Sequence, residues 1–236
     1  MRFPRATHLI ITGKSRTLLE DAVRPVVEGF LAERGLSLSP EKTLITRSTD
    51  GFTFLGQTFR KHGKVLHIKP SEQGVLALEQ KVGTMIREHV SAPMPVLIKE
   101  LNQVLRGWAN YHRHVVASEV FKSIDKYVFE HLWRMLKRRH PNKSANWLIK
   151  RYRSAAGQKH AFAVRAKTSK GTTIVYQVLR MSSIGIRRHV KIRAAANPYM
   201  PEDAAYFERR RHYRTSRSLS GKRTRELRAK IDANRK

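Results

Sequence analysis

The sequence predicts an α+β fold in which a strand-helix-hairpin piece precedes a helical bundle and a small mixed C-terminal segment with a basic tail. Three observations predict it. Residues 1–70 hold short apolar runs separated by glycine turns, which is typical of strands. Residues 71–153 place apolar side chains at helical spacing, whereas strand-like runs return at 154–213 and charge dominates 214–236. These four ranges are the predicted domains.

The first piece begins with a strand at residues 9–12 and a helix over residues 15–34. Ser15 is placed to cap the helix and Gly35 to end it, although Pro25 lies inside the pattern. Further strands are expected at residues 42–47, 52–60 and 64–69, with turns at residues 50–51 and 62–63. Within the second of these strands, Gly56 indicates a bulge or a close backbone approach.

The middle of the chain is predicted to be helical throughout. Ser71 caps a first helix, and the break at residues 93–95 precedes a second. A third helix is expected over residues 119–139, and residues 142–144 start a shorter fourth one. Cations in the last turn of the third helix suit the negative end of its macrodipole.

The C-terminal part changes character again. Strand-like runs at residues 160–166 and 172–181 flank a turn at residues 169–171, and a helix is expected near residues 202–211. The tail has few apolar residues and dense charge, so we expect it to be disordered or loosely helical without its partner.

Charge indicates the class of partner. The chain of 236 residues carries 48 Lys and Arg against 18 Asp and Glu, a formal net charge of +30. A compact body with this charge repels itself unless it lies against a polyanion. The cations recur along the whole chain instead of gathering on one amphipathic helix, and no apolar run approaches the roughly 20 residues of a membrane span. We therefore expect a nucleic-acid partner, no membrane, and a cytoplasmic location.

Cysteine is absent, which excludes thiolate zinc sites, disulfides and cysteine nucleophiles. The eleven histidines show no HExxH-like spacing, so no metal site is predicted.

Basic clusters carry the prediction of nucleic-acid binding. They are LKRRH (136–140), LIKRYR (148–153), IRRHVKIR (186–193) and the tail. Each cluster by itself has an alternative interpretation as a solvated face. Because Trp147, Tyr152 and Tyr176 are interleaved with them, the hypothesis is that cations neutralise phosphates while aromatic rings stack on unpaired bases.

Four motifs resemble one family. ERGLSLSPEKT (33–43) followed by GFTFLG (51–56) resembles the end of the palm of group II intron reverse transcriptases, the maturases. LNQVLRGWANYHRH (101–114) resembles an element of their maturase-specific thumb, or X domain. RRHVKIRAAANPYMPEDAAYFERRR (187–211) is similar to their DNA-binding segment. The resemblance implies a residual palm at 1–70, a thumb at 71–153 and a DNA-binding-like segment at 154–213.

Binding residues follow from the clusters and from this resemblance. The predicted RNA-binding residues are Lys42, Arg106, Tyr111, His112, Arg113, Lys137, Arg138, Arg139, Lys150, Arg151 and Arg153. Those predicted to bind DNA or RNA are Arg187, Arg188, Lys191 and Arg193. A palm lysine near Lys42 can assist polymerases, but an RNA or structural contact is the favoured interpretation here.

The chain departs from the family where catalysis would occur. In the family, Tyr-Ala-Asp-Asp precedes the strand corresponding to residues 9–12, and its aspartates hold the catalytic magnesium ions. This chain has Arg5, Ala6, Thr7 and His8 there. Thr and His do not replace a carboxylate pair, so no catalytic residue and no cofactor is predicted. Magnesium is expected only if another chain supplies the carboxylates. The Cys-stapled His-Asn-His endonuclease of many members is also not expected.

Several functions remain open on this basis. The favoured one is a truncated maturase that binds group II intron RNA and assists its folding and splicing, without polymerase activity of its own. An alternative is part of an active RNA-directed DNA polymerase completed by an N-terminal fingers and palm fragment. A general basic RNA-binding scaffold and a decayed reading frame are the others. A DNA target is a further candidate partner.

Overall fold

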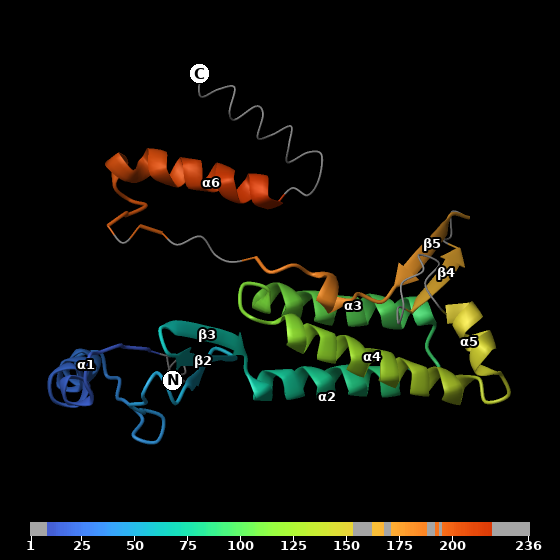
Figure 1. Ribbon diagram of the computed structural model, residues 1–236, viewed down its shortest axis with the longest axis horizontal. Helices are drawn as coiled ribbons and strands as arrows, with labels where there is room; N and C mark the ends of the chain where they lie inside the picture. The colour runs from blue at the N-terminus through green and yellow to red at the C-terminus, as the bar shows by residue number, and fades with distance from the viewer. Residues whose placement is uncertain (1–8, 153–161, 168–170, 188–191, 194, 219–236) are drawn as a thin grey trace. The chain divides into compact units, whose positions relative to one another are not determined.

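The computed structural model describes residues 9–152, 162–167, 171–187, 192–193 and 195–218, and it confirms the α+β class (Figure 1). The chain divides into two compact units, residues 1–188 and residues 189–236. The boundary falls inside the range 154–213 that the sequence treats as one segment. The two units are described separately.

The first helical segment consists of a π-helical turn, η1 (Leu18–Val23), that leads directly into α1 (Arg24–Ala32). The Ser15 hydroxyl oxygen accepts a hydrogen bond from the Leu18 amide at 3.2 Å, as a capping residue does. Pro25 lies in the first turn of α1, directly after the widened π-helical turn. Gly35 ends the segment with a φ of +66°, as predicted.

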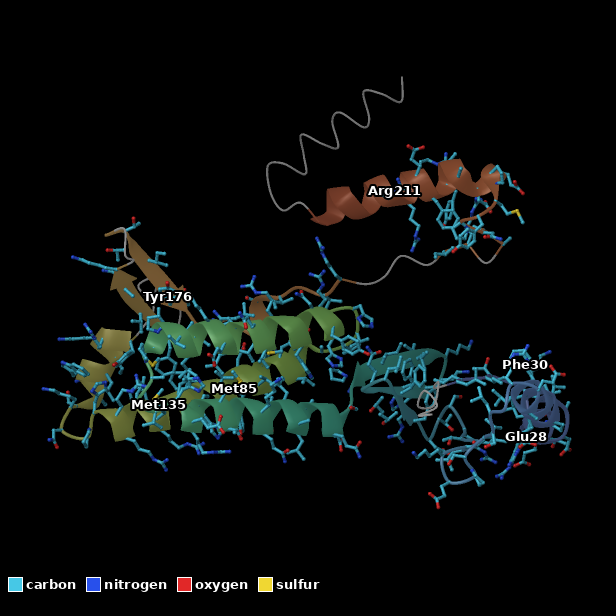
Figure 2. All side chains as sticks on the ribbon, turned by 180° about the vertical axis from the view of Figure 1, so that it is seen from behind. Glu28, Phe30, Met85, Met135, Tyr176 and Arg211 are labelled. Atoms are coloured by element: carbon cyan, nitrogen blue, oxygen red, sulfur yellow. The ribbon has the colours of Figure 1, made fainter. Side chains whose placement is uncertain are left out.

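Two predicted strands do not form. Residues 9–12 and residues 42–47 have no regular secondary structure. The physical reason is that a strand needs a neighbour to accept and donate its backbone hydrogen bonds. Among the described residues, none of those from 9 to 51 is buried, and Figure 2 shows side chains of α1, including Glu28 and Phe30, extending away from the helix.

The predicted strand over residues 52–60 is also wrong, because the chain turns inside it. Leu55 and Gly56 have φ values of +47° and +71°, which is the geometry of a tight hairpin turn. The result is an antiparallel sheet of β1 (Phe52–Phe54), β2 (Gln57–His62) and β3 (Val65–Pro70). Phe52 pairs with Phe59 across the first hairpin, and their rings stack with centroids 5.2 Å apart. The turn at Gly63 was predicted correctly.

Four helices follow in the predicted order, with ends close to the predicted ones. They are α2 (Glu72–Glu88), α3 (Met94–His112), α4 (Ser118–Arg139) and α5 (Ala145–Tyr152). Ser71 caps α2 by accepting from the Gly74 amide at 3.2 Å, and Ser144 accepts from the Trp147 amide at 3.3 Å. The apolar stripes of α2, α3 and α4 meet in one core, which includes Leu78, Val82, Leu97, Leu101, Leu105, Ile124, Leu132 and Leu136.

Arg139 joins the ends of two of these helices. Its guanidinium donates to the carbonyl oxygens of His89, Val90 and Ala92 at distances of 2.9, 2.7 and 2.8 Å. These carbonyls lie at the end of α2 and in the turn before α3, where no further helical N–H group can reach them. The C-terminal ends of α2 and α4 therefore lie together, and the two helices run in the same direction (Figure 1).

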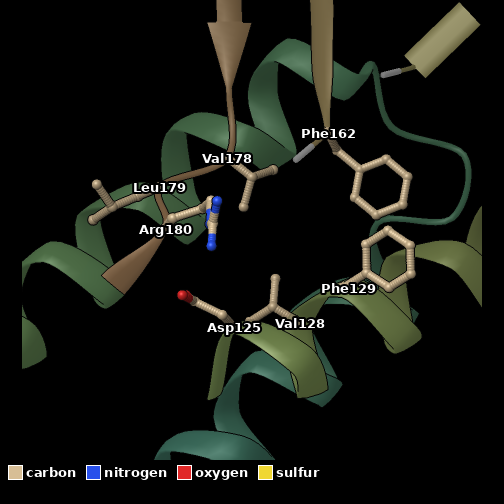
Figure 3. A pocket seen from close by; sticks show the side chains of 7 residues that line it. All are labelled: Asp125, Val128, Phe129, Phe162, Val178, Leu179 and Arg180. Atoms are coloured by element: carbon tan, nitrogen blue, oxygen red, sulfur yellow. The ribbon is translucent and has the colours of Figure 1, made fainter. Parts of the chain in front are cut away.

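A hairpin of β4 (Ala163–Lys167) and β5 (Thr173–Gln177) packs on the helices, as the strand-like runs predicted. The side-chain amide of Asn102 on α3 donates to the Gln177 carbonyl at 2.8 Å and accepts from the Leu179 amide at 2.7 Å. The Asp125 carboxylate on α4 accepts from the amides of Met181 and Ser182, in the short η2 helix (Met181–Ser183). Figure 3 shows Asp125 beside the segment after β5 that carries Val178 and Arg180.

The second unit is described from residue 192 to residue 218, apart from residue 194. It contains η3 (Pro201–Asp203) and α6 (Ala204–Ser218), so the helix predicted near residues 202–211 is confirmed and is longer. The Asp203 carboxylate accepts from the Asn197 amide at 2.8 Å, which fixes the loop before η3.

The link through Asn102 gives a stability prediction. We expect Asn102→Ala to lower the free energy of unfolding by about 1–3 kcal/mol, since two partly buried backbone groups lose their hydrogen-bond partner. Asn110→Ala is the matched control, because Asn110 is exposed on the same helix. Urea unfolding followed by circular dichroism measures both values, and equal losses in the two variants would contradict the prediction.

Candidate nucleic-acid interface

Most of the predicted RNA-binding residues are on the surface. Lys42 is exposed in the irregular segment before β1, and Arg106 is exposed on α3. Lys137 and Arg138 are exposed in the last turn of α4, and Lys150 and Arg151 on α5. The last four therefore lie on two helices that pack against each other at one end of the bundle. Lys42 does not lie on the helical bundle but in the irregular segment before β1.

His112 is the clearest correction. It is a predicted RNA-binding residue, but only 3% of its surface is exposed, so it does not reach an RNA backbone. Its ring packs on Trp108 with centroids 4.1 Å apart and meets Tyr111 edge-on. Within the described part of the chain, its Nδ1 atom has no hydrogen-bond partner. Burial lowers the pKa of His112 to about 4, with a smaller contribution from His114, so the ring is neutral at pH 7.

Arg139 also has a different place from the predicted one. It is half-buried, and its guanidinium is occupied by the three carbonyl oxygens at the end of α2. We therefore assign it to the structure of the bundle, although it belongs to the LKRRH cluster.

Tyr111 and Arg113 lie where α3 meets the three-stranded sheet. The Tyr111 hydroxyl donates to the Leu55 carbonyl at 2.7 Å, while half of the side chain stays exposed. Arg113 is half-buried, and its carbonyl accepts from the Arg187 amide at 2.7 Å. The Gln57 side chain contacts His114 at 3.2 Å. The Tyr111–Leu55 and Gln57–His114 contacts hold the sheet on the end of α3.

A cluster of aromatic rings and cations forms where α4 passes into α5. We call it the corner cluster: His140, Lys143, Trp147, Arg151 and Tyr152. The His140 ring meets Trp147 edge-on at 5.1 Å, and its Nε2 atom is 2.7 Å from the Tyr152 hydroxyl. Burial, and then the charges of Arg139, Arg151 and Lys143, lower the pKa of His140. This shift indicates that several cations share one small region.

The aromatic side chains of the corner cluster differ in what they expose. Trp147 is 36% exposed, and the Lys143 ammonium lies 5.7 Å from its ring centroid. Tyr152 is buried, so the prediction that it stacks on bases is wrong. Tyr176 is half-buried, with the Lys99 ammonium 5.4 Å from its ring centroid. Trp147 is thus the aromatic side chain of the cluster that a base can reach.

The sequence patterns did not single out Lys143, nor the similar pair of Lys137 and Trp133, whose ammonium-to-ring distance is 5.8 Å. In both cases the partners are four residues apart in the sequence. Trp133 and Lys137 thereby share one face of α4, whereas Lys143 lies in the turn before α5. The spacing was available in the sequence.

The remaining predicted residues belong to the C-terminal part. Arg187 is half-buried. Arg193 is exposed, with its guanidinium 4.4 Å from the Tyr206 ring centroid and 3.6 Å from the Asp203 carboxylate. Arg153, Arg188 and Lys191 lie outside the described residues. So do residues 5–8, where the sequence departs from the polymerase motif.

The described part of the chain contains no grouping of His, Asp and Glu side chains that could hold a metal ion. It also contains no helix with the length and apolar character needed to cross a membrane.

Together these features define a class: a strongly basic α+β protein whose helical bundle carries cations and an accessible tryptophan on its surface. A comparison with protein-family models assigns the helical bundle to a particular family. Residues 75–153 match the family described as group II intron, maturase-specific domain. The chain therefore contains this domain, from the first turn of α2 to the end of α5, and its resemblance to the C-terminal portion of group II intron maturases is confirmed. A comparison with curated proteins finds no match.

His112 gives a prediction about pH. Its pKa is about 4 in the folded chain and about 6.5 in the unfolded chain, so the unfolded state binds the proton first as the pH falls. We expect its contribution to stability, up to about 3 kcal/mol, to be complete above pH 6.5 and to be lost between pH 6.5 and 4.

The check is unfolding of the wild type and His112→Phe at several pH values. The difference in stability between them should change with pH in that window, in favour of the variant at low pH. His62→Phe, at an exposed position, is the control. A difference that stays constant from pH 7 to 4 would contradict the assignment.

Proposed function

We propose that this chain is an RNA-binding maturase-type protein that binds group II intron RNA and assists its folding and splicing. The observation that carries the proposal is the maturase-specific domain itself, folded as a bundle with Arg106, Lys137, Arg138, Lys150 and Arg151 exposed. In this function the intron RNA performs the transesterifications. The protein neutralises phosphates that repel each other when the RNA compacts.

The corner cluster supports the choice of RNA as the partner. Structured RNA offers unpaired bases in loops and bulges, and such bases stack on accessible aromatic rings. Trp147 has the exposure and the neighbouring cations that this contact requires. The predicted contacts of Arg187, Arg188, Lys191 and Arg193 with DNA or RNA belong to this proposal as well.

Polymerase activity of the chain alone is not part of the proposal. Arg5, Ala6, Thr7 and His8 stand where the family resemblance places the aspartates that hold magnesium. A polymerase requires such carboxylates to bind the metal ions and to stabilise developing charge.

A complementing polypeptide is the second candidate, and one observation favours it. Apolar side chains in residues 9–51 are strongly exposed, including Leu44 at 79%, Val26 at 72% and Phe30 at 55%. An exposed apolar surface of this kind is typical of a site that another protein surface covers. An N-terminal fingers and palm fragment would supply that cover, together with the carboxylates and their magnesium.

Primer extension separates the two candidates. We expect the purified chain to extend no primer in the presence of magnesium and dNTPs. Extension that appears only after an N-terminal fragment of a related reverse transcriptase is added would support the complemented polymerase. Extension by the chain alone would overturn the proposal that it has no polymerase site.

Salt dependence tests RNA binding. We expect affinity for a group II intron RNA to fall steeply between about 50 and 200 mM salt, because bound phosphates release counterions. The double variant Lys150→Gln, Arg151→Gln should reduce the slope of log affinity against log salt by about 0.7–0.9 for each phosphate contact removed.

The control for this experiment is Lys122→Gln, Lys126→Gln, which removes two cations of α4 that already pair with Glu119 and Glu130. A size-matched unrelated RNA is measured in parallel. Affinity that does not change with salt would contradict RNA binding through these cations. Equal affinity for both RNAs would favour the general basic scaffold over a maturase.

A further inference from the structure

A crevice of about 220 Å³ lies between the C-terminal halves of α2 and α4. Its lining residues are Ile86, Arg87, Val90, His131, Arg134, Met135 and Arg138. On α4, positions 131, 134, 135 and 138 share one helical face. Ile86 and Arg87 come from the last turn of α2, and Val90 follows two residues after the end of that helix. We call this site the α2–α4 crevice. None of its lining residues belongs to the corner cluster.

The α2–α4 crevice has an apolar floor and a cationic rim. Ile86 and Met135 are buried and Val90 is half-buried, so these three form the floor. Arg87, Arg134 and Arg138 are exposed and surround it. No Asp or Glu lines the crevice. A ligand that fits therefore combines a flat or compact apolar part with negative charge at its edge.

The rim arginines are available for such a ligand. Arg134 has Glu130 as its nearest carboxylate, at a distance of 3.7 Å and with both side chains largely exposed, so this pair is weak. Arg87 donates to the neutral Thr84 hydroxyl, and Arg138 forms no ion pair with a described residue. The carbonyls at the end of α2, which would repel an anion, are covered by Arg139.

His131 adds a directional polar group to the wall. Its Nδ1 atom is 2.9 Å from the Tyr127 carbonyl oxygen, so in the neutral ring Nδ1 donates and Nε2 accepts. The ring also stacks on Tyr127 with centroids 3.9 Å apart, which fixes its plane. An acceptor in a fixed position suits the N–H edge of a nucleobase.

We propose that the α2–α4 crevice holds one unpaired nucleotide of the bound RNA, with a pyrimidine base on the apolar floor and the adjoining phosphates on the rim arginines. The proposal rests on the proposed function and adds a nucleotide site to it. The volume is sufficient, since an apolar cavity of about 150 Å³ admits benzene, a ring of pyrimidine size. Aromatic or apolar cover of a base, with arginine at its phosphate, is the general way in which proteins bind unstacked nucleotides.

The test compares two RNA duplexes that are identical except for one bulged uridine. We expect the wild-type chain to bind the bulged duplex about tenfold more tightly, because the base gains an apolar site. A third duplex, with an abasic residue at the bulge, should lose this preference. That comparison separates recognition of the base from recognition of the bent backbone.

Two variants address the α2–α4 crevice directly. Val90→Phe fills the space from a half-buried position without changing charge, and it should abolish the preference while affinity for the plain duplex is kept. Arg134→Gln, Arg138→Gln should weaken binding of both duplexes and bring their affinities together. Val96→Phe is the matched control, since Val96 is 43% exposed on α3 and does not line the crevice. Thermal unfolding of each variant verifies that it is folded.

The outcomes separate this site from the proposed function. If the wild type binds neither duplex nor intron RNA, the proposed function fails. If it binds both duplexes equally, or if Val90→Phe keeps the preference, RNA binding stands and the nucleotide site is overturned. If polyglutamate removes the preference more effectively than poly(U) of equal charge, the crevice is a site for acidic peptides, and the proposal is likewise overturned.

Discussion

Mutual repulsion among the cations is the constraint on which the rest of this structure depends. The chain has 48 Lys and Arg and only 18 Asp and Glu, so folding brings like charges together at a cost. That cost is opposed by the apolar seam of α2, α3 and α4, where Leu97, Leu101 and Leu105 are completely buried. Outside this seam, in residues 9–51, the described chain buries no side chain.

The same constraint divides the cations into two kinds. Arg139 is used inside the fold, where its guanidinium neutralises backbone carbonyls at a helix end. Arg138, its neighbour in the LKRRH cluster, stays exposed. Two adjacent residues of one type thus serve folding and surface charge separately. A basic cluster in a sequence therefore indicates an interface only through those of its members that do not face the core of the fold.

The helices could be predicted from the sequence because the signals that start, continue and end a helix are local. Apolar periodicity, the caps at Ser71 and Ser144 and the stop at Gly35 act within a few residues, and each is present in the structure. Strands 9–12 and 42–47 were predicted wrongly because strand formation depends on a pairing partner elsewhere. The turn at Leu55 was missed because a positive φ at a branched apolar residue has no clear sequence signal.

The candidate site was predictable to a similar degree. Exposed cations of α3, α4 and α5 were found from charge clusters, and the maturase-specific motif identified the domain. The burial of His112 and Tyr152 could not be read from the sequence, since both lie in polar stretches beside exposed residues. The α2–α4 crevice could not be predicted from the sequence either, because its lining residues come from two segments about fifty residues apart in the chain.

The hairpin of β4 and β5 bears on where the folded domain ends along the chain. Phe162, Val178 and Met181 are buried in the same core as the three long helices, although the family match stops at residue 153. Asn102 and Asp125, which lie inside the matched range, use their side chains on backbone groups beyond it. The matched range is therefore shorter than the part of the chain that forms this core. A shortened protein intended for crystallisation or spectroscopy should include the chain to residue 187, since a cut at residue 153 would remove one wall of the core.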